Sequence, residues 1–234
     1  MTVLIIVLCL LTAASAVATI YFRTKGQSFN GMLCKFLSSF GFMSIAIAGF
    51  CNNHLSDPYY FFLAVFGLMF GQGGDILLGL KEIAPKFRSR LMAMGTSSFL
   101  AGHIFFIAAF IKVAGFSVFP FLIGVIIFAF ATVLIKILKF NVDKKMFVLL
   151  AAYYSILFAK CIMSFIALYR TGYNAFIVTS IGCVFFIISD TILGFLYFLP
   201  VKSKNKFVAA ELGTYYPAQI LLALSVSLIP VVAG

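Results

Sequence analysis

Two aspartates in matching settings are the residues of this sequence best suited to chemistry. Asp75 lies in Gly74–Leu80 (GDILLGL), and Asp190 lies 115 residues later in Ser189–Phe195 (SDTILGF). Both stretches belong to long apolar segments, in which an ionised aspartate costs about 3 kcal/mol on membrane-insertion scales. Such a residue therefore usually faces a polar cavity or a partner. Two acids placed in this way indicate a catalytic site or a translocation site.

Further polar residues in the apolar segments are candidates for supporting or substrate-binding roles: Lys35, His103, Lys160, Glu211, Tyr215 and Gln219. The last three recur every four residues and therefore share one helical face. Such a polar stripe usually lines a cavity or an interhelical contact.

The two lysines allow different interpretations. Lys35 lies near the start of its segment, where it could snorkel to the interface, bind a lipid phosphate or pair with a carboxylate. Lys160 lies near the middle of its segment, so we expect it to pair with Asp75 or Asp190. His103 is also central, and a hydrogen bond to a neighbouring helix would be enough to account for it.

Paired carboxylates in apolar surroundings suit general acid–base catalysis, with one group protonated while the other stays ionised. Other hydrolytic chemistries fit less well. A catalytic zinc usually has three protein ligands, but the sequence offers only His103 in an apolar segment and His54 in a loop. No G-x-S-x-G motif for a nucleophilic serine occurs. We therefore predict neither a metal site nor a cofactor.

The elements that must position these residues are membrane-spanning helices. Of the 234 residues, 64% are hydrophobic and only 10% are charged, which excludes a soluble domain of this length. A spanning helix needs about 20 predominantly apolar residues, and long non-alternating runs are helices rather than barrel strands. The sequence predicts an all-α polytopic protein with a single integral membrane domain, residues 1–234, and eight spans at about 2–22, 31–50, 58–80, 91–111, 116–136, 146–168, 173–199 and 211–232.

The net charge of +11 is a signal of topology. Thirteen of the seventeen basic residues fall at the odd-numbered loops, which places these loops in the cytoplasm and both termini on the opposite side. The same charges can contact anionic lipid head groups. We do not expect nucleic-acid binding, because no basic stripe with interleaved aromatic residues occurs. No basic residue precedes the first apolar segment, so we interpret it as a retained helix rather than a signal peptide.

The aspartate pattern extends into a weak internal repeat. Lys35 of the second span corresponds to Lys160 of the sixth, and His103 of the fourth corresponds to Gln219 of the eighth. We therefore predict a parallel four-plus-four pseudo-repeat whose polar residues meet between the halves. All the charged candidates lie between mid-bilayer and the predicted cytoplasmic surface. A cavity opening on that side would suit a single-chain amphiphile.

Four short motifs carry a family resemblance: the G-D-x-L of Gly74–Leu77, the Gly102-His103 pair, the F-I-I-S-D of Phe186–Asp190 and the Tyr-x-x-x-Gln of Tyr215–Gln219. In this order and spacing, the chain resembles the lysoplasmalogenase (YhhN-like) family of eight-helix membrane enzymes over nearly its whole length. A lysine at the start of the second span also fits. The family often has proline at the next position, where this chain has Phe36.

The resemblance implies hydrolysis of the vinyl ether bond of lysoplasmalogens, which are lysophospholipids of the bilayer, to a fatty aldehyde and a glycerophospho-head group. It implies that Asp75 and Asp190 supply the acid and the base or stabiliser, in either order. His103, Tyr215 and Gln219 would position water or adjust the aspartates. Lys35 and Lys160 would hold the phosphate or set the protonation of the acids.

Two other functions use the same residues. A proton-coupled transporter of lipid or small solutes would use the acids as proton carriers. A non-catalytic lipid-binding or scaffold protein would bind ligand without turnover. Product formation separates the first interpretation from these two.

Overall fold

The computed structural model describes residues 3–52, 57–139 and 143–230. Within these ranges the chain forms eight α-helices and no strand, and each helix is long and apolar enough to cross a membrane. The helices are α1 (Val3–Thr24), α2 (Ser28–Asn52), α3 (Pro58–Ile83), α4 (Arg88–Ala114), α5 (Phe119–Ile137), α6 (Lys144–Thr171), α7 (Asn174–Phe198) and α8 (Lys204–Leu224). The predicted all-α, eight-span, multi-pass membrane protein is confirmed.

Local sequence signals fix several helix ends. The side chain of Asp57 accepts a hydrogen bond from the backbone N–H of Tyr60 at the start of α3, and Pro58 occupies the first turn. Asp143 caps α6 in the same way through the N–H of Met146. At the other end of α6, Gly172 takes a left-handed conformation with φ of 67°, which a glycine adopts at low cost.

The last helix departs from its predicted position of 211–232. It begins seven residues earlier, at Lys204, because the helix extends back through the apolar residues 207–210 and the polar residues 204–206. It ends at Leu224 and passes into a 3₁₀ turn, Ser225–Ser227. Pro230 follows, and a proline disfavours helical backbone at the residue before it. Residue 2 and residues 231–232 of the predicted spans lie outside the described residues.

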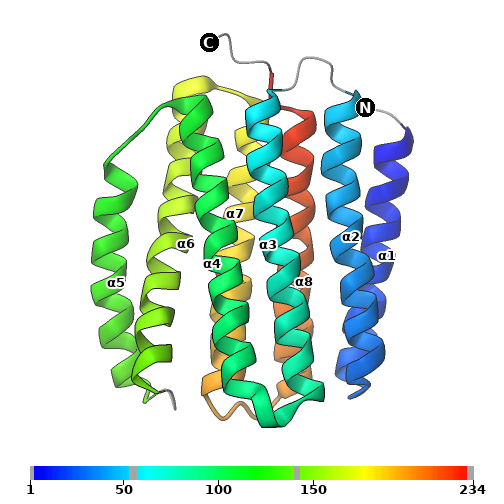
Figure 1. Ribbon diagram of the computed structural model, residues 1–234, viewed down its shortest axis with the longest axis vertical. Coiled ribbons are helices and arrows are strands. Elements are labelled where there is room, and N and C mark those ends of the chain that lie inside the picture. The colour runs from blue at the N-terminus through cyan, green and yellow to red at the C-terminus, as the bar shows by residue number, and fades with distance from the viewer. Residues whose placement is uncertain (1–2, 53–56, 140–142, 231–234) are drawn as a thin grey trace.

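The helices run side by side, with α3, α4, α7 and α8 in the centre (Figure 1). The pair α1 and α2 lies at one edge of the bundle, and the pair α5 and α6 lies at the other. The first helix begins and the last helix ends at the same end of the bundle (Figure 1). The connections that carry most of the basic residues lie at the opposite end, which is called the basic end below.

Helix packing is closest between α3 and α4. A Cβ atom on Gly102 would lie 2.8 Å from the carbonyl oxygen of Gly67, so the two backbones are nearly in contact. At the edges, α1 packs against both α2 and α8, whereas α5 packs against α6 alone among the described helices. The two edge helices thus differ, and the predicted four-plus-four repeat stays a prediction.

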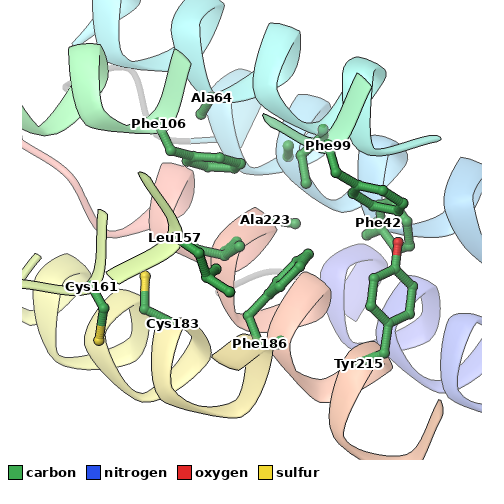
Figure 2. Packing of buried hydrophobic residues seen from close by; sticks show 14 of the residues in the cluster. Phe42, Ala64, Phe99, Phe106, Leu157, Cys161, Cys183, Phe186, Tyr215 and Ala223 are labelled. Carbon is green, nitrogen blue, oxygen red and sulfur yellow. The ribbon is translucent and has the colours of Figure 1, made fainter. Parts of the chain in front are cut away.

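The centre of the bundle is rich in aromatic side chains. Phe99 of α4, Phe186 of α7 and Tyr215 of α8, which are labelled in Figure 2, form an edge-to-face group. Phe186 is 2% exposed. Any polar side chain in this interior must therefore find its partners within the protein.

Candidate active site

The structure gathers seven of the eight predicted site residues into two polar clusters. The first, called the Asp75 cluster, consists of Lys35, Ser39, Asp75, Tyr215 and Gln219. The second, called the Asp190 cluster, consists of His103, Tyr153, Lys160 and Asp190.

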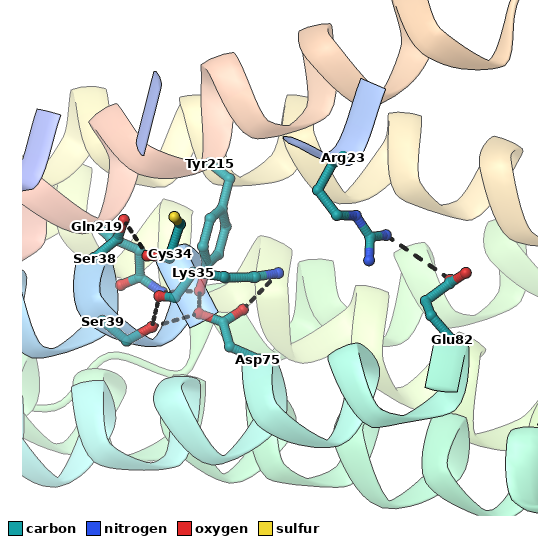
Figure 3. Close-up of polar contacts among 9 residues, drawn as sticks. All are labelled: Arg23, Cys34, Lys35, Ser38, Ser39, Asp75, Glu82, Tyr215 and Gln219. Carbon is teal, nitrogen blue, oxygen red and sulfur yellow. Dashed lines mark hydrogen bonds and ion pairs between the residues drawn. The ribbon is translucent and has the colours of Figure 1, made fainter. Parts of the chain in front are cut away.

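Asp75 is held by an ion pair and two hydroxyl groups (Figure 3). Lys35 Nζ lies 2.9 Å from Oδ1, and the hydroxyls of Tyr215 and Ser39 donate to Oδ2 over 2.6 and 3.0 Å. The Asp75 side chain is only 1% exposed. A cation and two donors together stabilise the ionised carboxylate in this dry setting.

Helical spacing brings this cluster together. Lys35 and Ser39 lie one turn apart on α2, and Tyr215 and Gln219 lie one turn apart on α8, where Gln219 Nε2 donates to the Tyr215 hydroxyl over 2.9 Å. Gly71 lies one turn before Asp75 on α3. A Cβ atom there would lie 3.3 Å from Gln219 Nε2, so the glycine leaves room for the amide.

The Asp190 cluster is a row of hydrogen bonds. The hydroxyl of Tyr153 donates to Asp190 Oδ2 and lies 3.0 Å from His103 Nε2. His103 Nδ1 lies 3.2 Å from Lys160 Nζ. An ammonium group can only donate, so Nδ1 accepts and Nε2 carries the ring proton. Each group then donates to the next, and the row ends on the Asp190 carboxyl group.

The prediction that Lys160 pairs directly with a carboxylate is wrong. The hydrogen-bonded row from Lys160 to Asp190 runs through His103 and Tyr153, and the lysine makes no described ion pair with the acid. The side chain is fully buried, and its Nζ also lies 4.4 Å from the ring centroid of Phe186. Cation–π contact of this kind supplies part of the stabilisation that a carboxylate would have given.

Aromatic rings connect the two clusters. The Phe186 ring centroid is 5.6 Å from that of Tyr215 and 4.9 Å from that of His103. The described residues show no hydrogen bond between Asp75 and Asp190. The two acids are therefore neighbours with separate networks, not a dyad that shares one proton. Each network joins both halves of the chain, since α8 contributes to the Asp75 cluster and α4 to the Asp190 cluster.

A cavity reaches the Asp190 cluster. It measures about 40 Å³, and its walls include Thr96, Phe99, Tyr153, Tyr154 and Asp190. A buried water needs about 10–15 Å³ of such volume, so this space, called the chamber below, has room for a few waters.

A wider cavity at the basic end adjoins the chamber. This second cavity, called the basic mouth, measures about 520 Å³, and its wall includes Lys86 and Arg88. The two cavities share four wall residues: Met92, Met146, Tyr197 and Phe198. The chamber beside Asp190 therefore adjoins a cavity at the basic end of the bundle.

Glu211 belongs to neither hydrogen-bond network. It is buried and lines a separate cavity of about 20 Å³, together with Arg23 and Lys35. The prediction that it lies near the other polar residues holds through Lys35, but it has no described hydrogen bond to an aspartate.

Tyr153 and Ser39 are site residues that the sequence prediction did not include. Both had a signal in their spacing. Tyr153 lies seven residues before Lys160, and Ser39 lies four residues after Lys35, so each shares a helical face with a predicted residue.

This fold and site define a polytopic helical membrane protein with two buried aspartate networks, one of which lines a cavity that adjoins a basic surface. A family model, that of the YhhN family, matches residues 30–226, which is most of the chain. The protein belongs to this family, the family of lysoplasmalogenases. No curated protein and no solved structure matches the chain.

Proposed function

We propose that the protein is a lysoplasmalogenase that hydrolyses the vinyl ether bond of lysoplasmalogens, with Asp190 as the proton donor. YhhN family membership supports lysoplasmalogenase-like activity in general. The observation that carries the assignment to Asp190 is the chamber, which has this residue in its wall and adjoins the basic mouth.

The chemistry of a vinyl ether requires an acid. Protonation of the β-carbon gives an oxocarbenium ion, water adds to the carbon bonded to oxygen, and the resulting hemiacetal collapses to an aldehyde and an alcohol. Among the described contacts, the Tyr153 hydroxyl occupies Oδ2 of Asp190, which leaves Oδ1 to carry the proton to the substrate. The carboxylate formed by this transfer would then stabilise the adjacent cation and accept a proton from the attacking water, as in glycosidases.

The hydrogen-bond row behind Asp190 would stabilise this carboxylate. Lys160 donates to His103, His103 to Tyr153, and Tyr153 to Asp190. Negative charge that appears on Asp190 during the reaction therefore meets a donor that is already oriented. In this proposal Lys160 and His103 are positioning residues, because they act through Tyr153.

Asp75 has a different role in this proposal. Its ion pair with Lys35 and its two hydroxyl donors keep it ionised, so it is a poor proton donor. It holds Tyr215, whose ring packs edge-on against Phe99 in the chamber wall, with 6.3 Å between centroids. Asp75 thus acts on the shape of the chamber indirectly, through Tyr215.

The basic mouth suits the head group. Neither Lys35 nor Lys160 is free to bind phosphate, since each is engaged within a cluster. Lys86 and Arg88 are exposed on the wall of the mouth, where a phosphodiester could reach them while the vinyl ether enters the chamber.

The test is aldehyde release by the purified protein in nanodiscs containing a choline lysoplasmalogen, with alkyl ether and acyl ester analogues in parallel. We expect aldehyde from the vinyl ether alone. Asp190→Asn should lower the rate by about 10²–10⁴, the usual contribution of a general acid. Asp57→Asn is the matched control, because asparagine also caps helices and residue 57 lies at the far end of the bundle.

Three results would point elsewhere. An Asp190→Asn variant that keeps more than about a tenth of the wild-type rate would remove this residue from proton transfer. Release from the acyl ester would indicate a lysophospholipase. Uptake of lipid or solute into proteoliposomes without any product would favour the proton-coupled transporter.

A further inference from the structure

An apolar groove lies on the bundle between α5, α6 and α7. It measures about 340 Å³. Its wall is hydrocarbon except for two hydroxyl-bearing residues, and it is formed by Ile127, Phe130, Ala131, Leu134, Ile135, Tyr154, Phe158, Thr191 and Phe195. We call it the α5 groove.

The position of α5 accounts for the groove. Among the described helices, α5 packs against α6 alone, so its face toward α7 has no helix against it. At the opposite edge of the bundle, α1 packs against both α2 and α8. In a membrane the α5 groove therefore opens toward the hydrocarbon of the bilayer, which is where a lipid chain is found.

Tyr154 lines both the α5 groove and the chamber. Its hydroxyl donates to the backbone carbonyl oxygen of Asp190 over 3.0 Å. A Cβ atom on Gly194 would lie 2.8 Å from the same hydroxyl, so the glycine provides the space in which this ring sits. One aromatic side chain thus stands between the bilayer-facing groove and the carboxyl group of Asp190.

We propose that the α5 groove holds the single hydrocarbon chain of the lysolipid substrate, and that Tyr154 is the gate through which the chain reaches the chamber. This inference rests on the proposed function. Three adjoining spaces match the three parts of such a lipid. The phosphate head group occupies the basic mouth, the vinyl ether lies at Asp190, and the chain passes Tyr154 into the α5 groove.

The dimensions of the groove agree with this occupant. Ile127 and Ile135 both line it and are eight residues apart on α5, which is roughly 12 Å at 1.5 Å per residue. Half of the bilayer hydrocarbon is about 15 Å thick. The groove therefore accommodates most of a chain that spans one leaflet. The lipid chain moves from the bilayer into an equally apolar groove. The chain length of the substrate should therefore have little effect on the rate of the wild-type protein.

The first test measures binding without turnover. The sequence contains no tryptophan, so a single introduced tryptophan reports on its own surroundings. Leu134→Trp places the fluorophore in the α5 groove, and Val133→Trp, next to it on α5 and 54% exposed, places one outside the groove wall. The probe is a saturated 1-O-alkyl lysophosphocholine brominated at the end of its chain, added to nanodiscs of unbrominated lipid.

We expect saturable quenching of Leu134→Trp that the unbrominated ether reverses. Val133→Trp should be quenched only in proportion to the amount of probe in the bilayer. Equal, unsaturable quenching of both variants would mean that ordinary bilayer chains fill the groove, and this would overturn the proposal. Since the probe cannot be hydrolysed, this result does not depend on whether the protein is an enzyme.

The second test fills the groove. Ala131→Trp adds a large ring to its wall, while Ala129→Trp adds the same ring to an exposed position on the same helix. Long-chain and short-chain lysoplasmalogens are compared for each variant. For Ala131→Trp, kcat/KM should fall by about tenfold or more for the hexadecenyl substrate and stay within about twofold for the octenyl substrate.

Ala129→Trp should have the same kcat/KM as the wild type for both substrates. An equal loss on the two substrates with Ala131→Trp would show that the groove does not take the chain. Absence of aldehyde from the wild-type protein would reject the proposed function instead, and the quenching experiment would still decide the occupant of the groove.

Discussion

The ion pair between Lys35 and Asp75 gives a prediction whose size follows from the structure. Its charged atoms are 2.9 Å apart, and the two side chains are 16% and 1% exposed. At an effective dielectric constant of about 20, this separation corresponds to an attraction of about 6 kcal/mol, which is an upper limit because desolvation opposes it. Removing one member of a buried pair typically costs about 3–5 kcal/mol.

The two single variants should differ. Lys35→Met leaves a carboxylate in a dry site with only the Ser39 and Tyr215 hydroxyls, so the free energy of unfolding should fall by about 3–5 kcal/mol. Asp75→Asn leaves a lysine whose stem can carry its ammonium toward the basic end, so the loss should be smaller, about 1–2 kcal/mol. The double variant leaves no unpaired charge, and it should be more stable than the sum of the two losses predicts by about 2 kcal/mol.

Equilibrium unfolding of the four proteins in mixed micelles measures this double-mutant cycle. Lys86→Met is a suitable control, because this lysine is exposed and its loss should change the free energy by less than about 0.5 kcal/mol. A coupling energy below about 0.5 kcal/mol would show that the two charges do not stabilise each other, and the role given to Asp75 would then fail.

Four further predictions concern packing and topology. Gly102→Ala should lower the free energy of unfolding by about 1–3 kcal/mol, because its Cβ would press on the carbonyl oxygen of Gly67. A Cβ atom on Gly213 would meet no neighbouring helix or side chain within 4 Å, so Gly213→Ala should raise the free energy of unfolding by up to about 1 kcal/mol in the same assay. Arg170→Ala removes a side chain that donates to three backbone carbonyls at the end of α4 and in the next loop, so limited proteolysis should cut that loop faster. A cysteine replacing Lys86 in a cysteine-free background should react with an impermeant maleimide from the cytoplasmic side only, and labelling from the other side would reverse the predicted topology.

The fold was largely predictable because each membrane-spanning helix corresponds to a long apolar segment of the sequence. A helix in lipid must satisfy its own backbone and present apolar side chains, so its sequence shows where it lies. The start of α8 was the least predictable boundary. The helix includes the polar residues 204–206, where water can solvate the side chains, and hydropathy carries no signal of helix there.

The site was predictable in its members but not in its contacts. Asp75 and Asp190 stand out because a charge in an apolar segment requires a partner. The choice of partner depends on how each helix is rotated and where it crosses its neighbours, which no single segment specifies. Lys160 was therefore assigned a carboxylate, although a histidine and a tyrosine lie between them. The spacing of Tyr153 places it on the helical face of Lys160, but its hydrogen bond to Asp190 was not predictable, since a tyrosine in an apolar segment looks the same whether it packs or donates.

The open face of α5 was not predictable from the sequence either. The first and fifth helices are both strongly apolar, with mean hydropathies of 2.7 and 2.4. Nothing in their composition distinguishes a helix with two neighbours from a helix with one. Only the structure shows that α5 leaves a groove beside α7.

The order of the clusters along the chain has a consequence for biosynthesis. Lys35 and Ser39 lie on α2, which leaves the ribosome before α3 brings Asp75 into the membrane. Tyr153 and His103 lie on α6 and α4, which likewise precede α7 and Asp190. Each acidic side chain thus enters the bilayer when a partner is already in place, and neither must wait unpaired in hydrocarbon for a later helix. The vectorial order of translation itself protects the two carboxyl groups during assembly.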